Sequence, residues 1–323
     1  NRFSSAMKKL SADGWQPDAV ISHSGWGCGL DVSSIFPKSL KISYLEWWFK
    51  DNSDDFAFHP DSKWFQYSDS LILDLRRRNL SVSLELSEAD IIISPSNWQK
   101  SQLPAGIQAR CMVLHEGVDT SYFVFNPKWK SNDTLRLTYC TRGMEPMRGF
   151  PEFVEVLPDL FRLFPNLEVL IAGNDRVAYG SIKPSEGSFG KWAKVILEEW
   201  IRLEKVKFLG HIPLPQYARL LKSSDVHCYL TRPFVVSWSL LDAMASGCCI
   251  VATDIAATRE FLDPASTIWT SHQLEGSLFS SLSHALSLER SERLRRGELQ
   301  RQKILENWER QQSLDKWCGL LGI

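Results

Sequence analysis

The sequence has no excess of charge of either sign. It carries 37 Lys and Arg residues against 38 Asp and Glu residues, which gives a formal net charge of −1 at pH 7. A protein with this balance has no overall field to hold a polyanion, so nucleic acid is not an expected partner. Low-complexity tracts are also missing, which excludes a largely disordered chain.

Long apolar runs are missing as well. The richest stretch, residues 234–252, is interrupted by Asp242 and Gly247, whereas a membrane-spanning helix needs roughly 18 apolar residues in a row. The 7 cysteines form an odd set, and Cys248 and Cys249 lie in an apolar run where a thiol behaves as a small hydrophobe. We therefore expect inert core thiols and a cytoplasmic protein that touches a membrane at most peripherally.

Several catalytic signatures have no counterpart in the sequence. No group of His and Cys residues has zinc spacing, and neither a Gly-x-Ser-x-Gly elbow nor a Walker loop occurs. We expect no metal site and no serine chemistry.

Short β-branched runs alternate with helical periods along the chain. Connections too long for hairpins indicate parallel sheets. The expected strands are residues 18–22, 41–45, 89–93 and 112–114, then residues 135–139, 167–172, 206–209, 226–230 and 249–252. The polar stretch 123–133 between the two series is interpreted as a linker. We expect two Rossmann-like α/β domains, residues 1–125 and 126–305, and a helix over residues 306–323 near the region between them.

Two helices stand out by their patterns. Residues 150–164 carry apolar side chains at steps of three and four, which predicts one stripe that faces a sheet. A last helix over about residues 290–317 carries many charges, which we interpret as a solvated face. The alternative is a basic patch that docks on a membrane, made of Arg293, Arg295, Arg296, Arg301 and Lys303.

Loops that follow strands are where open parallel sheets bind ligands. After the strand at 135–139, Arg142 and Arg148 lie on a loop that opens a helix, and such guanidinium groups suit phosphate oxygens. After the strand at 226–230, Ser237 or Ser239 can cap a helix whose amides near Leu240 would be free for an anion. A plain pair of surface arginines is the structural alternative.

Further residues at strand ends join these candidates. Asp242 falls in or near the first turn of the capped helix, where its alternative role is to complement the helix dipole. Gly173-Asn174 and His211-Ile212 lie in turns after strands, and turns with glycine let the backbone approach a flat ligand.

Strand ends in the first domain also carry polar side chains. Glu46 follows the second expected strand and, with the nearby glycines, superficially suggests a dinucleotide fingerprint. The glycine spacing does not fit that motif, so we interpret these residues as lining a cleft, with a core histidine as the alternative for His23. The cleft candidates are His23, Gly25, Trp26, Gly27 and His115.

Several ordered motifs together resemble one known family. They are residues 115–123, Arg142 with Arg148-Gly149, residues 208–210, residues 214–225, and residues 239–252 followed by Arg259-Glu260. This series resembles the family 4 retaining glycosyltransferases of GT-B architecture. The resemblance implies two domains that face a cleft, with a nucleoside diphosphate sugar bound on the C-terminal one. A glycan, lipid or small-molecule acceptor would bind on the N-terminal one, and no metal or cofactor would be needed.

The resemblance also implies roles for single residues. Arg142 and Arg148 match the basic pair on the donor diphosphate, and Asp242 matches the acid on the donor ribose. Glu46 falls where many members have a cleft histidine near the reacting sugar, which makes it a third catalytic candidate. The other implied donor-binding residues are Ser239, Leu240, Leu241, Gly173, Asn174, His211 and Ile212.

Two departures from the family pattern leave the function open. Phe234 stands where the first acid of the Glu-x7-Glu motif is expected, and a phenyl ring cannot accept a hydrogen bond from a sugar. The chain begins at Asn1, and nothing before Asp18 supplies the family's first strand and helix, so we expect that unit to be missing. The main alternative is a catalytically silent GT-B-like scaffold subunit that binds a nucleotide sugar. A nucleotide-sugar epimerase would need acid and base carboxylates as well.

Overall fold

The chain forms two compact units. The computed structural model describes residues 2–50, 58, 62–64, 69–130, 134–179, 182–271 and 276–323. Unit 1 comprises Asn1–Ala57, Tyr67–Gly117 and Gln311–Ile323, and unit 2 comprises Phe58–Gln66 and Val118–Arg310. The division therefore falls at Gly117, and the last residues of the chain return to unit 1.

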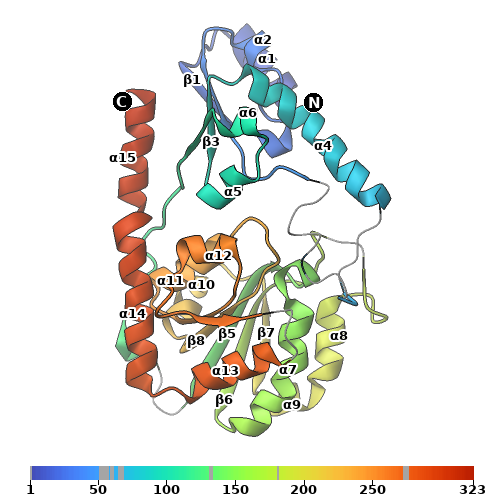
Figure 1. Ribbon diagram of the computed structural model, residues 1–323, viewed down its shortest axis with the longest axis vertical. Coiled ribbons are helices and arrows are strands. Elements are labelled where there is room, and N and C mark those ends of the chain that lie inside the picture. Colours follow the sequence, from blue (N-terminus) through green and yellow to red (C-terminus); the bar gives the residue numbers. More distant parts are fainter. Residues whose placement is uncertain are drawn as a thin grey trace. The chain divides into compact units, whose positions relative to one another are not determined.

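Unit 1 is built on a four-stranded parallel sheet (Figure 1). Its strands β1 (Ala19–His23), β2 (Leu40–Tyr44), β3 (Ile91–Ser94) and β4 (Cys111–Val113) pair in that order, which confirms the four strands expected. In the register of β1 and β2, His23 pairs with Tyr44, so the carboxyl ends of these strands lie side by side. The helices are α1 (Arg2–Ala12), η1 (Ser24–Trp26), α2 (Val32–Ile35), α4 (Asp69–Glu88), α5 (Asn97–Ser101), α6 (Ala105–Gln108) and α15 (Arg310–Leu321).

Both faces of this sheet are covered at its inner strand β3. Ile92 and Ile93 are neighbours on β3 and point to opposite faces, yet they are only 1% and 0% exposed. Ile92 packs with Val82 and Leu86 of α4, whereas Ile93 belongs to a cluster against which Trp317 of α15 packs. Because both faces of β3 are buried, apolar residues follow one another along this strand, as is usual in a parallel sheet. The helix α1 precedes β1, where the sequence analysis assigned no element.

Unit 2 is built on a six-stranded parallel sheet of order β10-β9-β8-β5-β6-β7 (Figure 1). The strands are β5 (Leu135–Gly143), β6 (Leu167–Asn174), β7 (Val206–Gly210), β8 (Val226–Tyr229), β9 (Cys249–Thr253) and β10 (Ile268–Thr270). The first five were expected, and β10 was not. The helices are η2 (Pro127–Trp129), η3 (Pro146–Arg148), α7 (Phe150–Leu163), α8 (Phe189–Ile196), α9 (Glu198–Arg202), α10 (Leu214–Lys222), α11 (Trp238–Ala245), α12 (Ala256–Phe261), α13 (Ser277–Ser287) and α14 (Arg290–Asn307).

The apolar stripe of α7 faces the sheet as its spacing predicts. Phe150, Phe153 and Leu157 are 0% exposed, and the Phe153 ring stacks on Tyr139 of β5 with 4.6 Å between ring centroids. The segment expected as a linker belongs to unit 2 as far as residue 130, and its Phe123 and Lys130 are buried. Residues 131–133 of that segment lie outside the described residues.

The predicted single helix over residues 290–317 is two helices, so this prediction is wrong. The first, α14, ends at Asn307, and α15 begins at Arg310. Between them the Trp308 carbonyl accepts a hydrogen bond from the Val118 N–H at 2.8 Å, and the Arg310 N–H donates to the Val118 carbonyl at 2.9 Å. The helix is interrupted because these backbone groups pair with Val118 in a parallel bridge instead.

The basic residues of α14 are held by neighbours within unit 2. Arg295 and Arg296 both pair with Glu292 on the same helix. Those that donate to backbone carbonyl groups are Arg293, Arg301 and Lys303. The structure therefore does not support the membrane-docking alternative for this helix. No helix among the described residues combines the length and apolar character that crossing a membrane requires.

Candidate active site

The order of strands in unit 2 creates a topological switch point. The chain passes from β5 to β6 on one side of β5, but it reaches β8 on the other side. Open α/β sheets bind ligands outside the carboxyl ends of their strands at such a point. The loops that follow β5 and β8 are therefore the expected ligand-binding elements of this unit, and both carry residues singled out in the sequence.

Arg148 joins these two loops. Its Nη1 donates hydrogen bonds to Thr231 Oγ1 at 2.8 Å and to the Val235 carbonyl at 3.1 Å, and it lies 3.4 Å from the Tyr229 hydroxyl. Arg148 ends η3, directly before the Gly149 that caps α7. A half-buried guanidinium held by several acceptors has little freedom to turn, so its remaining N–H groups keep one direction.

Arg142 lies near the end of β5 and is exposed. Within the described ranges it makes no hydrogen bond and no ion pair, in contrast to Arg148. Both arginines belong to the segment that leads from β5 into α7, as the sequence indicated. Only Arg148 is anchored, which the sequence did not reveal.

Glu145 is a buried acid between the two arginines that the sequence analysis missed. Its Oε2 accepts hydrogen bonds from the N–H groups of Ala178 at 2.5 Å and Tyr179 at 2.9 Å. Burial raises the pKa of Glu145, and these two N–H groups and the charges of Arg148 and Arg176 oppose that shift. Glu145 thus ties the loop after β5 to the segment after β6. In the sequence, an acid between two arginines on one loop was the pattern that could have identified Glu145.

Phe234 lies in the loop after β8 and is 5% exposed. Its ring meets Tyr179 edge-on with 4.9 Å between centroids, and the Arg148 guanidinium carbon lies 5.8 Å from its centre. The position where the family pattern has an acid is therefore an apolar contact beside the anchored arginine.

The start of α11 confirms Ser237 as its N-cap. The Ser237 side chain accepts a hydrogen bond from the Ser239 N–H at 3.3 Å. However, the Leu240 N–H donates to the Ser237 carbonyl at 3.0 Å, so this amide is not free for an anion as expected. The first turn is tightened by an i to i+3 bond, a common way to satisfy helix-terminal groups. The Leu240 and Leu241 side chains are 0% and 1% exposed.

Asp242 lies one turn further along α11 and bonds to a tyrosine. The Tyr217 hydroxyl of α10 donates to Asp242 Oδ2 at 3.3 Å. Burial raises the pKa of Asp242 to about 7, opposed by the Tyr217 hydrogen bond and the charge of Arg310. Because the first turn of α11 has no acid, complementing the helix dipole does not explain this residue.

The turn after β6 brings two backbones very close together. Gly173 has φ +146°, and a Cβ on it would lie 2.3 Å from the Thr141 carbonyl oxygen, so no larger residue fits. The Asn174 carbonyl accepts an amide hydrogen bond from the loop after β5. His211 and Ile212 follow β7 at the same edge of the sheet, exposed and half-buried respectively.

In unit 1, His23 and Glu46 form a pair at the ends of β1 and β2. His23 Nε2 lies 3.1 Å from Glu46 Oε2, and the His23 side chain is 21% exposed although both of its ring nitrogens are buried. Trp26 stacks on the His23 ring with 4.5 Å between centroids and is itself 70% exposed. Since Glu46 pairs with His23, and Gly25 and Gly27 form the turn η1 and its C-cap, the structure does not support a dinucleotide site.

A second histidine–carboxylate pair lies at the same edge of the unit 1 sheet. His115 Nδ1 accepts a hydrogen bond from the Gly117 N–H at 2.9 Å, and its Nε2 lies 3.6 Å from Glu116 Oε2. Burial, followed by the charges of Glu116 and Glu46, raises the pKa of Tyr44, so this phenol stays neutral. The edge therefore gathers two imidazoles, two carboxylates and a phenol, of which the sequence analysis missed Tyr44 and Glu116.

Metal and thiol chemistry find no support in the parts of the chain that the structure describes. No group of three or more His, Cys, Asp or Glu residues there could hold a metal ion. Cys228, Cys248 and Cys249 are free and buried, and burial raises the pKa of Cys249 to about 12. The thiols therefore stay protonated, and their burial agrees with a role in core packing.

Two protein families match the chain in succession. The model of the glycosyl transferase family 4 group matches residues 1–123, and that of the glycosyl transferases group 1 matches residues 124–307. The second match alone covers more than half of the chain.

Individual relatives are similar to parts of the chain only. A phosphatidyl-myo-inositol mannosyltransferase of Mycobacterium tuberculosis is 29% identical over 119 residues, which are 36% of this chain and 28% of that protein. The corresponding mannosyltransferase of Mycolicibacterium smegmatis is 27% identical over 171 residues, 51% of this chain and 39% of that protein. The matched part thus spans less than half the length of these relatives.

Solved structures share the fold across nearly the whole chain. Sucrose-phosphate synthase from Thermosynechococcus elongatus superposes with a TM-score of 0.73 at 14% identity, over 98% of this chain and 76% of that one. HepE of Anabaena, in complex with UDP and glucose, gives a TM-score of 0.72 at 12% identity, over 99% and 80%. With both family models and these neighbours in agreement, the chain belongs to the family 4, group 1 glycosyltransferases and has the GT-B fold.

Proposed function

We propose that the chain transfers a sugar from a nucleoside diphosphate sugar to an acceptor hydroxyl, with retention of configuration. The observation that carries this proposal is the anchoring of Arg148 across the switch point of the unit 2 sheet. Membership of the family supports glycosyl transfer, and the UDP complex of HepE supports a nucleotide-linked donor. The cleft between the domains stays a prediction from the resemblance.

Charge that develops on the leaving group explains why a fixed guanidinium matters. As the nucleoside diphosphate departs, negative charge grows on a phosphate oxygen, and preorganised donors aimed at that oxygen lower the barrier. Among the described residues, the acceptors around Arg148 contact its Nη1 alone, which leaves its other N–H groups for phosphate. Together with Arg142 it supplies the positive charge, so we propose a reaction without metal or cofactor in which the leaving phosphate takes the acceptor proton.

The rest of the donor would lie along the same edge of the unit 2 sheet. Asp242, once ionised, can accept hydrogen bonds from ribose hydroxyls, and Ser239 offers a hydroxyl near the diphosphate. The turns at residues 173–174 and 211–212 would meet the base through their backbone. These assignments extend the site from the anchored arginine outward.

The acceptor side is proposed for unit 1. Glu46, whose side chain is 33% exposed and lies against His23, offers a carboxyl group, and the exposed ring of Trp26 suits stacking on a sugar or cyclitol ring. A polyhydroxylated acceptor, free or linked to a lipid, fits this combination, and the name of the mannosyltransferase relatives supports the lipid-linked form. Glu46 remains the catalytic candidate of unit 1.

Nucleotide binding tests the proposal directly. UDP, GDP and ADP are added in turn, and the unfolding midpoint of the chain is followed. We expect at least one of them to raise the midpoint, Arg148→Ala to abolish the rise, and Arg162→Ala to leave it intact, since Arg162 lies exposed at the far end of α7. A chain whose midpoint responds to none of the three, or responds equally in both variants, contradicts the proposal.

The alternative function, a silent scaffold that binds a nucleotide sugar, rests on Phe234. Its buried ring packs on Tyr179 and, unlike the expected acid, supplies no acceptor for a sugar hydroxyl. Tight nucleotide binding with no release of nucleotide from any sugar nucleotide in the presence of acceptor would favour this alternative.

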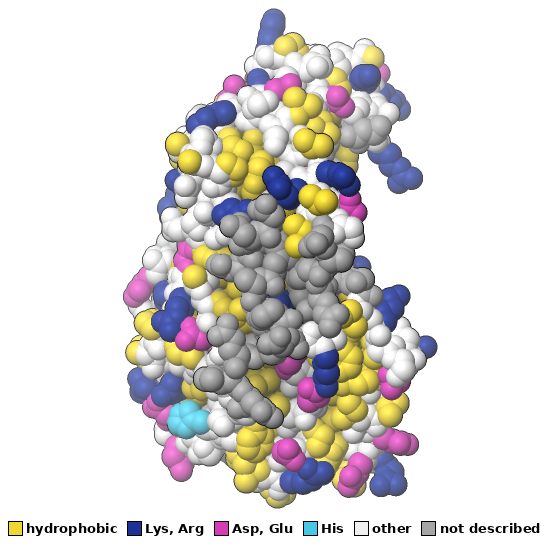
Figure 2. Space-filling model, turned by 45° about the vertical axis from the view of Figure 1, so that its right-hand side comes forward, with side chains coloured by type: hydrophobic (Ala, Val, Ile, Leu, Met, Phe, Trp, Pro, Cys, Tyr) yellow, Lys and Arg dark blue, Asp and Glu magenta, His cyan; other side chains and the backbone are white. Residues whose placement is uncertain are grey.

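We also propose that the protein is cytoplasmic and contacts a membrane surface through α4. Leu73, Leu80 and Leu84 fall on one face of this helix and are 50%, 72% and 51% exposed. Arg76 and Arg77 lie beside them, and Arg77 forms an exposed ion pair with Asp74. Figure 2 shows hydrophobic and basic side chains close together on the upper, unit 1 part of the surface. Leu80→Asp should reduce co-sedimentation with anionic vesicles, and equal sedimentation of variant and parent would contradict this contact.

A further inference from the structure

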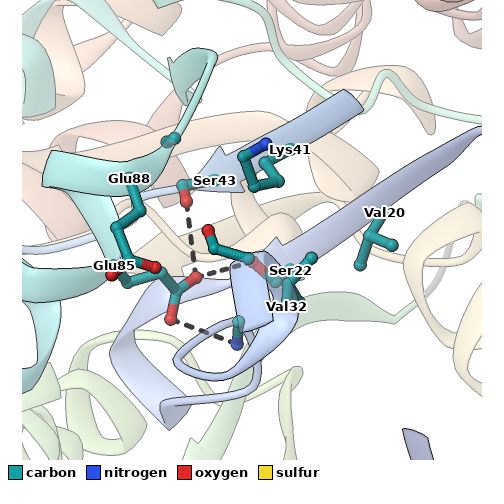
Figure 3. Close-up of a pocket in the computed structure, with 10 residues that line it drawn as sticks. Val20, Ser22, Val32, Lys41, Ser43, Glu85 and Glu88 are labelled. Carbon is teal, nitrogen blue, oxygen red and sulfur yellow. Dashed lines mark hydrogen bonds between the residues drawn. The ribbon is translucent and has the colours of Figure 1, made fainter. Parts of the chain in front are cut away.

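Glu85 is a buried carboxylate that the proposed chemistry does not use. It lies near the end of α4, is 3% exposed, and makes no ion pair with any described residue. Its Oε1 accepts a hydrogen bond from Ser22 Oγ at 2.6 Å and lies 3.4 Å from Ser43 Oγ, and its Oε2 accepts from the Gly29 N–H at 3.2 Å (Figure 3).

The partners of Glu85 enclose one short segment of chain. Ser22 lies directly before His23, and Gly29 lies three residues after Trp26, so the carboxylate holds residues 23–28 at both ends. A Cβ on Gly29 would lie 2.3 Å from Ser22 Oγ and 2.5 Å from Glu85 Oε1, so a larger residue there would displace the Ser22 hydroxyl and the Glu85 carboxyl group. The segment thus packs closely against the Glu85 carboxyl group.

Three donors converge on the two oxygens of the Glu85 side chain. All three partners are donors, and a carboxylate offers acceptors only, whereas a glutamine would direct an NH₂ group at one of them. An acidic side chain is seldom fully buried without an ion-pair partner, which marks this contact as unusual. Ser43 adds the second strand to the same carboxylate, which couples the end of β2, and hence Glu46, to the segment.

We infer that Glu85 is a positioning residue, which fixes His23 and Trp26 for the acceptor; this inference rests on the proposed function of unit 1. It acts through the backbone and does not touch the acceptor itself. Its loss should loosen residues 23–29 and weaken acceptor use, while unit 2 keeps its affinity for the nucleotide. The signal in the sequence was an acid in the buried phase of a helix, beside Val82, Leu86 and Ala89.

Hydrogen exchange tests the inference without any ligand. Glu85→Gln is compared with Glu88→Gln, which alters an exposed acid further along the same helix that lines the same small pocket. We expect amide exchange in residues 23–29 to quicken about tenfold or more in Glu85→Gln only, with the strands of unit 1 unchanged. Ser22→Ala, which removes one donor and keeps the charge, should give a smaller change in the same segment. Unchanged exchange there, or faster exchange throughout unit 1, overturns the inference.

Kinetics provide the second readout. With phosphatidylinositol in detergent micelles as acceptor probe, and the sugar nucleotide identified by the nucleotide panel, Glu85→Gln should raise the acceptor KM about tenfold to a hundredfold. The nucleotide-induced rise in unfolding midpoint should match that of Glu88→Gln. A fall in kcat with an unchanged acceptor KM overturns the inference. If no transfer is detected at all, the proposed function fails on that ground, and the exchange measurement alone decides the role of Glu85.

Discussion

The anchoring of Arg148 makes Thr231→Val the most informative single change in unit 2. Thr231 is 0% exposed, its Oγ1 accepts a hydrogen bond from Arg148 Nη1 at 2.8 Å, and it donates to the Arg232 carbonyl at 2.8 Å. Valine keeps the shape and removes the hydroxyl. Arg148 then keeps the Val235 carbonyl as its main acceptor, and the guanidinium regains freedom to turn.

The expected magnitude follows from these contacts. A hydrogen bond to a charged group contributes about 1.5–3 kcal/mol, and the added methyl group returns about 0.8 kcal/mol. We expect the free energy of unfolding to fall by about 1–2 kcal/mol, which lowers the unfolding midpoint by roughly 2–8 °C for a unit of this size. The affinity for a nucleoside diphosphate should fall about tenfold, because part of the binding energy must now order the arginine.

A matched control separates anchoring from stability. Thr138→Val removes another fully buried hydroxyl, whose partners are Ser224 and His227, from the same sheet. It should destabilise the chain comparably, while titration calorimetry should give the parent's nucleotide affinity. Equal losses of affinity in both valine variants, or an unchanged affinity in Thr231→Val, would refute the reasoning.

Two further predictions concern burial in unit 2. Because burial raises the pKa of Asp242 to about 7, its neutral form stabilises the folded chain at low pH, and this contribution is lost as the pH rises through about 7. Asp242→Asn should remove a slope on the order of 1 kcal/mol per pH unit between about pH 4 and pH 7, measured by urea unfolding; an unchanged slope would exclude this titration. Gly247 has φ +69°, and a Cβ on it would lie 2.2 Å from the Phe125 ring, so Gly247→Ala should cost about 2–5 kcal/mol. Gly276→Ala, at φ +74° with open space around it, should cost only about 1–2 kcal/mol, and similar thermal midpoints for the two variants would count against the steric argument.

The regular elements of the fold could be predicted from local sequence. The strands β1 to β9 lie in short apolar runs. In β3, β8 and β9 nearly every residue is buried, so residues on both faces of the sheet are apolar and the strand can be identified from composition. The apolar stripe of α7 could also be predicted, because residues three and four apart share one face of a helix. The short edge strand β10 was missed, since three residues carry too little pattern.

The candidate site could be predicted only as a set of positions. The sequence placed Arg142, Arg148 and Asp242 at strand ends, because parallel strands bring all their carboxyl ends to one edge. It gave no indication that the Leu240 amide is already bonded, since helix-terminal bonding depends on how the first turn closes.

The sequence by itself determined which segments become strands and helices, and which of their ends carry polar groups. Only the tertiary structure decided the partners: Arg148 meets Thr231 across 83 residues of chain, and Ser22 meets Glu85 across 63. It also decided the break between α14 and α15, where Val118 pairs with the backbone. Local periodicity records burial on a face, whereas a contact between distant residues exists only after strand order and register bring two loops together.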